Sequence, residues 1–286
     1  MGRAEPWLIL EIKKSSFPTS ESLETYLDSL LERAESWVPL SRRMALVAME
    51  DRHFLPAIQA RFRPENIYVQ PEGWGNSIAV FLMLIDVERR NRDAQVVYLC
   101  GRPTRREASL EASLRLAYLR SLEHPTQLLL LGYRSTAGAG SSEADWLVPG
   151  NGPGVDRPIS ALIHSQDLDF ANHLSRQGAL REVGVVAGDI GIFLLSYMLA
   201  QTEMIRLFLG DGKNPGAKNF TVEVSVELSL KTLRRDILRE NLSLLRCLPT
   251  ANPGFDDAQR GSFSPARSLE ISYLKSRPPN FQTFLH

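Results

Sequence analysis

One stretch, residues 66–104, constrains the fold of this chain more than any other. It starts with a short strand-like run at 67–69, turns at Pro71–Gly75, continues with a helical pattern from Asn76 to Arg90, and ends in the apolar run Val96–Leu99. A strand, a helix and a second strand at this spacing predict a βαβ crossover. A continuously apolar second strand favours a parallel sheet that is covered on both faces.

The same stretch predicts where a ligand would bind. Ligands of open α/β sheets bind at the carboxyl ends of the strands, which are here the loops 71–77 and 100–104. Asn76 is expected to cap the following helix, whose N-terminus favours an anion or the edge of a base. Arg102 is either a bidentate phosphate ligand or an ordinary surface arginine. The candidate nucleotide-side residues are Gly75, Asn76, Ser77, Gly101 and Arg102.

Strand-like and helical patterns alternate along the remainder of the chain. Strands are predicted at 7–12, 44–49, 128–133, 146–148, 159–163, 184–187 and 268–274, and helices at 23–37, 53–62, 105–122, 167–177, 192–209 and 224–245. This order predicts an α/β protein with a doubly wound, mainly parallel (mixed) sheet of Rossmann-like character.

We expect a single domain over residues 1–286, because 286 residues can bury one large core. Its first half spans residues 1–134, a Gly-rich loop with a short strand spans 135–158, and the second half spans 159–286. No C-terminal cupin or β-helix domain is expected.

Composition excludes several classes of function. Lys+Arg and Asp+Glu number 33 each, so no charge excess points to nucleic acid or to an anionic membrane. The longest apolar segment, 183–200, is interrupted by glycines and an aspartate, so no membrane span is expected. Cys100 and Cys247 lie in apolar contexts that predict buried thiols and a cytoplasmic protein.

The histidines are too scattered to predict a metal site. None of them has the HxxxH or HxH spacing with which two histidines on one element share a metal. They lie at positions 53, 124, 164, 173 and 286.

Several segments, in this order, resemble sugar-1-phosphate nucleotidyltransferases, in particular the mannose-1-phosphate guanylyltransferase (GDP-mannose pyrophosphorylase) family. The resemblance extends from Ser20 to the C-terminus. The segments that carry it are SESLETYLDSLLERAESWVP, RRMALVAMEDRHF, ENIYVQPEGWGNSIAV, HPTQLLLLGYR followed by WLVPG, and QGAL followed by an apolar strand.

The resemblance implies a glycosyltransferase-A-like fold, a Gly-rich loop around a nucleoside triphosphate, and Mg²⁺ held by two aspartates. This chain departs from that pattern. It reads Lys13-Lys14-Ser15-Ser16 where the Gly-rich loop would follow the first strand, and Arg102 stands in place of a metal aspartate. On the sugar-phosphate side, Ser165 stands where the family has a lysine, and Arg181-Glu182 stands where it has Trp-Asn. At the second metal position, Asn280 is the residue nearest to the expected aspartate. An arginine cannot ligate Mg²⁺, which takes oxygen ligands.

These departures lead to three hypotheses. The first is a catalytically inactive homologue that binds a nucleotide or nucleotide sugar, or regulates an active paralogue. The second is a divergent active enzyme that makes a nucleotide sugar, and Mg²⁺ is expected only in this case. The third is an assembly protein with a filled pocket. A homo-oligomer is compatible with all three.

Overall fold

The computed structural model describes residues 6–13, 22–70, 72–100, 107–134, 144–152, 154–165, 167–200 and 230–250. The predicted segments at 201–209 and 268–274, and the loops at 14–21, 101–106 and 135–143, lie outside these ranges. The strands are β1 (Pro6–Ile12), β2 (Arg43–Ala48), β3 (Ile67–Gln70), β4 (Gln95–Leu99), β5 (Leu128–Tyr133), β6 (Ala144–Pro149), β7 (Arg157–Ser165), β8 (Leu180–Asp189) and β9 (Leu245–Thr250).

Six α-helices and five 3₁₀- or π-helical turns connect the described strands. The helices are α1 (Leu23–Ala34), α2 (Leu55–Gln59), α3 (Ser77–Arg90), α4 (Glu107–Ser121), α5 (Leu168–Arg176) and α6 (Ile190–Ala200). The turns are η2 (Leu40–Arg42), η3 (Met49–Phe54), η4 (Pro64–Asn66), the π-helical η5 (Leu233–Leu238) and η6 (Leu242–Leu244). Among the described residues, no helix has both the length and the apolar character needed to cross a membrane.

The nine strands of the described residues form one mixed sheet with the order β3-β2-β1-β4-β8-β5-β9-β7-β6. Strands β3, β2, β1 and β4 are parallel, as are β5 and β9. Strand β8 runs antiparallel to both β4 and β5, and β6 and β7 also make antiparallel pairs. The expected α/β class is confirmed, but the expectation of a mainly parallel sheet is wrong for the half that contains β8.

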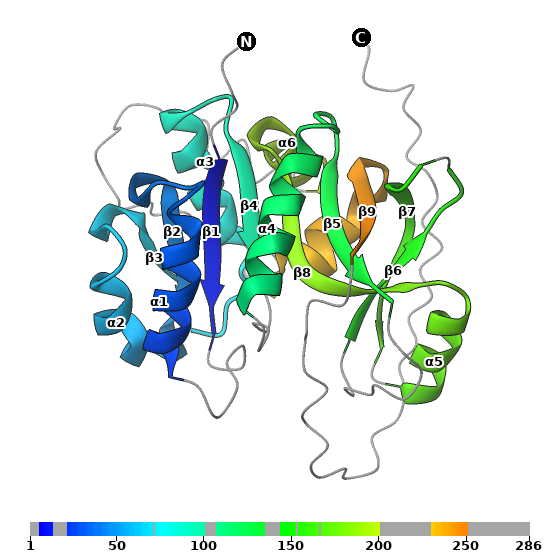
Figure 1. The fold of residues 1–286 in the computed structure, drawn as a ribbon, viewed down its shortest axis with the longest axis horizontal. Coiled ribbons are helices and arrows are strands. Elements are labelled where there is room, and N and C mark those ends of the chain that lie inside the picture. Colours follow the sequence, from blue (N-terminus) through cyan, green and yellow to red (C-terminus); the bar gives the residue numbers. More distant parts are fainter. Residues whose placement is uncertain are drawn as a thin grey trace.

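Helices cover both faces of the sheet, and the core is divided accordingly (Figure 1). On β1, Trp7 and Ile9 point to the face that α3, α6 and η5 cover, whereas Leu8 and Leu10 point to the face that α1 and α4 cover. This alternation follows from the two-residue repeat of a strand. Glu11 falls on the same face as Trp7 and Ile9, so a carboxylate ends this otherwise apolar row.

The predicted helical stretch over 224–245 is helical in most of its described part, but it is not one continuous α-helix: residues 233–238 form the π-helical turn η5 and 242–244 form the 3₁₀ turn η6. Leu245–Thr250 forms β9, a strand that the local pattern does not predict. Strand β9 lies between β5 and β7, and its burial comes from these distant partners. The predicted helix at 53–62 is also shorter, because 49–54 adopts a 3₁₀ turn before α2.

Candidate functional site

A buried polar cluster lies near the carboxyl ends of β1 and β4. The amide nitrogen Nδ2 of Asn76 donates hydrogen bonds to both carboxylate oxygens of Glu11 and to the hydroxyl of Tyr98, each at 3.0 Å. The Tyr98 hydroxyl donates to Glu11 Oε2 at 2.5 Å, and Lys13 Nζ pairs with Glu11 Oε1. Burial, and then the charge of Glu11, raises the pKa of Tyr98, so this phenol remains a hydrogen-bond donor.

Asn76 does not cap α3 in the expected way. It occupies the N-cap position, but its backbone is helical and its side chain makes no capping hydrogen bond. Its Oδ1 accepts instead from the backbone N–H of Leu233 at 2.8 Å, and the Ser77 N–H donates to the carbonyl oxygen of Lys231 at 3.1 Å. Residues 230–235, called here the bridge segment, therefore satisfy one of the backbone N–H groups that the first turn of α3 leaves free.

Gly75 is required by the close approach of the bridge segment. A Cβ atom added at Gly75 would lie 2.0 Å from the carbonyl oxygen of Lys231 and 2.5 Å from that of Leu230. Only a residue without a side chain leaves room for two backbones at this separation.

A second cluster joins the bridge segment to β6, β7 and β8. The guanidinium of Arg234 donates to both oxygens of Glu182, at 2.8 and 2.6 Å, and to Asp145 Oδ2 at 2.7 Å. The other oxygen of Asp145 lies 2.8 Å from His164 Nδ1. Burial opposes the ionisation of Asp145, but the hydrogen bond with His164 and the charge of Arg234 lower its pKa to about 2.

The two clusters flank the end of β4. Cys100 follows this strand, and its N–H donates to the carbonyl of Gly184 in β8 at 2.7 Å. Burial raises the pKa of the Cys100 thiol, which makes it a poor nucleophile. Charges from both clusters act on this thiol: those of Arg234, Glu11, Glu182 and Lys13.

The structure places the predicted residues as follows. Gly75, Asn76 and Ser77 lie where the first cluster meets the bridge segment, and Glu182 belongs to the second cluster. Gly101 and Arg102 lie outside the described residues. Ser165 ends β7 beside His164. The described residues therefore bring Asn76 and Glu182 to the same end of β4 through one connecting segment.

Sequence reasoning missed several members of the two clusters, namely Glu11, Tyr98, Asp145, His164 and Arg234. Glu11 had a usable signal, since a carboxylate inside the apolar run WLILEI must find a partner if it is buried. The others had none, because their partners come from other elements of the fold.

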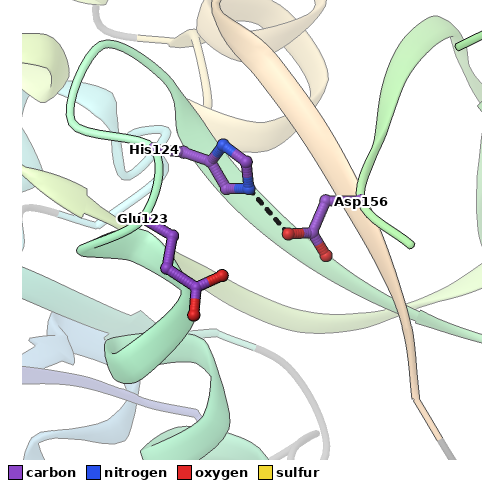
Figure 2. Close-up of side chains that lie close together, drawn as sticks. All are labelled: Glu123, His124 and Asp156. Carbon is purple, nitrogen blue, oxygen red and sulfur yellow. Dashed lines mark hydrogen bonds and ion pairs between the residues drawn. The ribbon is translucent and has the colours of Figure 1, made fainter. Parts of the chain in front are cut away.

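One group of side chains among the described residues has the composition of a metal site. It consists of Glu123, His124 and Asp156 (Figure 2) and lies away from both clusters. Within the clusters themselves, the described carboxylates are already engaged by lysine, arginine, asparagine or histidine.

Comparisons with known proteins identify the fold. No protein-family model and no curated protein sequence matches the chain. The crystal structure of mannose-1-phosphate geranyltransferase from Thermus thermophilus aligns over 86% of this chain and 74% of its own, with a TM-score of 0.63 and 16% identity. That of mannose-6-phosphate isomerase from Helicobacter pylori aligns over 86% of this chain and 97% of its own, with a TM-score of 0.58 and 14% identity. At these identities, the chain shares a fold with both proteins.

Proposed function

We propose that this protein binds a nucleotide or nucleotide sugar at the carboxyl end of β1 and β4 and does not catalyse nucleotidyl transfer. It acts as a cytoplasmic partner or regulator of an active homologue. Two solved structures of similar fold are named for mannose phosphates, and the proposal extends this chemistry to the present chain.

The observation that carries the proposal is the engagement of the cationic groups described at this edge. Lys13 pairs with Glu11, and Arg234 holds Glu182 and Asp145. Nucleotidyl transfer needs preorganised positive charge that is free to stabilise the developing charge on phosphate. Here the described cations neutralise carboxylates of the protein itself. This arrangement favours a stable polar surface over a catalytic phosphate-binding site.

The second cluster offers groups suited to sugar hydroxyls. The side chains of Asp145 and His164 are 20% and 29% exposed, and they lie beside the buried Glu182. Carboxylate oxygens and imidazole nitrogens accept hydrogen bonds from ring hydroxyls. We therefore assign the sugar side of the ligand to this cluster and the nucleotide side to Gly75–Ser77 and Arg102.

Two measurements test the proposal. With GTP, mannose 1-phosphate and Mg²⁺, pyrophosphate release should not exceed the background, whereas turnover near about 1 s⁻¹, within the ordinary enzyme range, contradicts it. In calorimetry and thermal-shift titrations, GDP-mannose should bind and stabilise the fold by about 2.7 kcal/mol at about a hundred times the Kd. A flat response to nucleotides and nucleotide sugars would leave only an assembly role.

Three variants locate the ligand. Arg102→Glu should weaken binding of both GDP and GDP-mannose, because it reverses a charge expected beside the phosphates. Arg63→Glu is its control, since Arg63 is half-exposed and precedes β3 at the opposite edge of the sheet. His164→Ala should weaken GDP-mannose binding and leave GDP binding unchanged. Equal losses for the two ligands would place His164 away from the sugar.

A further inference from the structure

Glu123, His124 and Asp156 meet at the edge of the sheet opposite the candidate site. Glu123 and His124 lie in the turn between α4 and β5, and Asp156 immediately precedes β7. Strand β5 is parallel to β1 and β4, because β8 runs antiparallel to both β4 and β5. The turn that leads into β5 therefore lies at the amino ends of these strands.

The three side chains bring their ligand atoms within 4.8 Å of one another (Figure 2). The Nε2 atom of His124 lies 2.6 Å from Asp156 Oδ2, and the carboxylate of Glu123 lies to one side of this pair. Two ligands of a tetrahedral ion with bonds of about 2.0–2.2 Å lie about 3.3–3.6 Å apart. Binding would therefore require the His124–Asp156 pair to separate slightly and the exposed Glu123 side chain to move closer by up to about 1.5 Å.

Asp156 supplies an independent observation that points to a ligand. This residue is only 6% exposed, and its Oδ1 is buried without a hydrogen-bond partner among the described residues. Leaving a buried carboxylate oxygen unsatisfied destabilises the folded protein. A cation that both oxygens of Asp156 ligate would satisfy Oδ1 and neutralise this buried carboxylate.

Two arginines lie near these side chains. Arg120 pairs with Glu123 at 2.7 Å, but its side chain is 37% exposed and can turn to solvent. Arg246 donates to the backbone carbonyl of Asp156 and not to its carboxylate. The competition from Arg120 is therefore the main obstacle to a cation, and it is one that a substitution can remove.

The geometry points to a site for a first-row transition metal, with Zn²⁺ as the preferred ion, formed by Glu123, His124 and Asp156. An imidazole with two carboxylates suits Zn²⁺ and disfavours Mg²⁺ and Ca²⁺, which take oxygen ligands. Three protein ligands leave a fourth position for water. The ion would tie the α4–β5 turn to the start of β7, far from the ligand site at the other edge.

Calorimetric titration of the EDTA-treated and dialysed protein with ZnCl₂ tests this site. We expect one zinc per chain, no competition by Mg²⁺, and a rise in Tm with zinc. His124→Ala and the near-isosteric Asp156→Asn should each weaken binding at least about tenfold. His173→Ala, on the exposed end of α5, is the matched control and should leave the affinity unchanged.

Arg120→Gln separates a metal site from an ion-pair network. At a metal site, removal of the competing arginine should tighten zinc binding by up to about fivefold, since an exposed ion pair is weak. Co²⁺ should also give a visible absorption band that His124→Ala abolishes. The inference is overturned if zinc binds equally to wild type and His124→Ala, or if no saturable binding occurs.

Discussion

Replacing Arg234 with methionine should lower the free energy of unfolding by about 3–5 kcal/mol. The guanidinium forms a bidentate pair with Glu182, whose side chain is only 3% exposed, and a further bond to Asp145. Methionine fills similar space but leaves two carboxylates facing each other without their cation. The buried Glu182 then retains its desolvation cost with nothing to offset it.

The magnitude follows from the geometry of the cluster. Two unit charges about 4 Å apart attract by about 4 kcal/mol at an effective dielectric constant of about 20. The N–O separations of 2.6–2.8 Å place Arg234 within this range of both carboxylates. Part of the attraction offsets desolvation, so the loss expected on breaking the pair stays near about 3–5 kcal/mol. That is a large share of the roughly 5–15 kcal/mol that stabilises a typical domain.

Urea denaturation at pH 7 measures the effect through the midpoint at a constant m-value. Arg234→Met combined with Glu182→Met should recover most of the loss, because well-packed apolar residues can replace a buried ion pair at little cost. Arg61→Met is the control: Arg61 pairs with Asp28, whose side chain is 62% exposed, and its loss should cost no more than about 1 kcal/mol. A cost for Arg234→Met equal to that of the control, or a double variant no better than the single one, would refute the reasoning.

The pH dependence of the Arg234→Met variant has a defined sign. Burial raises the pKa of Glu182, and Arg234 normally counteracts this effect. Without Arg234, the folded-state pKa of Glu182 lies further above its unfolded value, so the stability that Glu182 contributes to the variant is greatest below the unfolded pKa and is lost as pH rises. The difference in free energy of unfolding between the wild type and the variant should therefore become smaller from pH 7 to pH 5.

Two further predictions concern single residues. The pKa of Asp145 is lowered from 3.8 to about 2 in the folded protein, so its stabilising contribution is complete above about pH 4 and is lost towards pH 2. This loss amounts to roughly 2 kcal/mol in acid denaturation curves, and it should be absent in Asp145→Asn. Gly75→Ala should cost about 1–3 kcal/mol through the clash with Lys231. Gly73→Ala has open space and a φ of +75°, so only backbone strain of about 1 kcal/mol should appear in the urea midpoint.

Local pattern predicts the elements whose burial is set along the chain. Strands β2, β4 and β5 each contain a continuous apolar run that is buried, and α3 follows a Gly-rich turn. The position and type of these four elements could therefore be predicted from the sequence. The direction of β8 could not, because nothing in residues 180–189 specifies antiparallel pairing with β4 and β5. Strand β9 was missed for the same reason, since its partners β5 and β7 come from distant parts of the chain.

The same distinction applies to the candidate site: residues set by the local sequence could be predicted, and contacts with distant residues could not. Gly75-Asn76-Ser77 could be placed from a turn that precedes a helix, but the role of Asn76 could not, because its partners Glu11 and Leu233 lie far away in sequence. Arg234 carries no local signal at all. In the sequence it resembles any arginine in a helical stretch, and only the convergence of β6 and β8 shows that it lies partly buried between two carboxylates.

The bridge segment bears on the proposal that this edge binds a ligand without transferring a nucleotidyl group. The N–H of Ser77 in the first turn of α3 already donates to the Lys231 carbonyl, so a phosphate at this helix N-terminus must compete with a backbone group of the protein itself. A neutral hydrogen bond of this kind contributes only about 0.5–1.5 kcal/mol, which an anion with stronger, charge-assisted bonds can overcome. Displacing the segment further would pull Arg234 from Glu182 and Asp145, at a far higher cost. The geometry therefore favours a ligand that binds without displacing the bridge segment. It disfavours the alignment of a triphosphate and a metal ion for transfer, which would require that displacement.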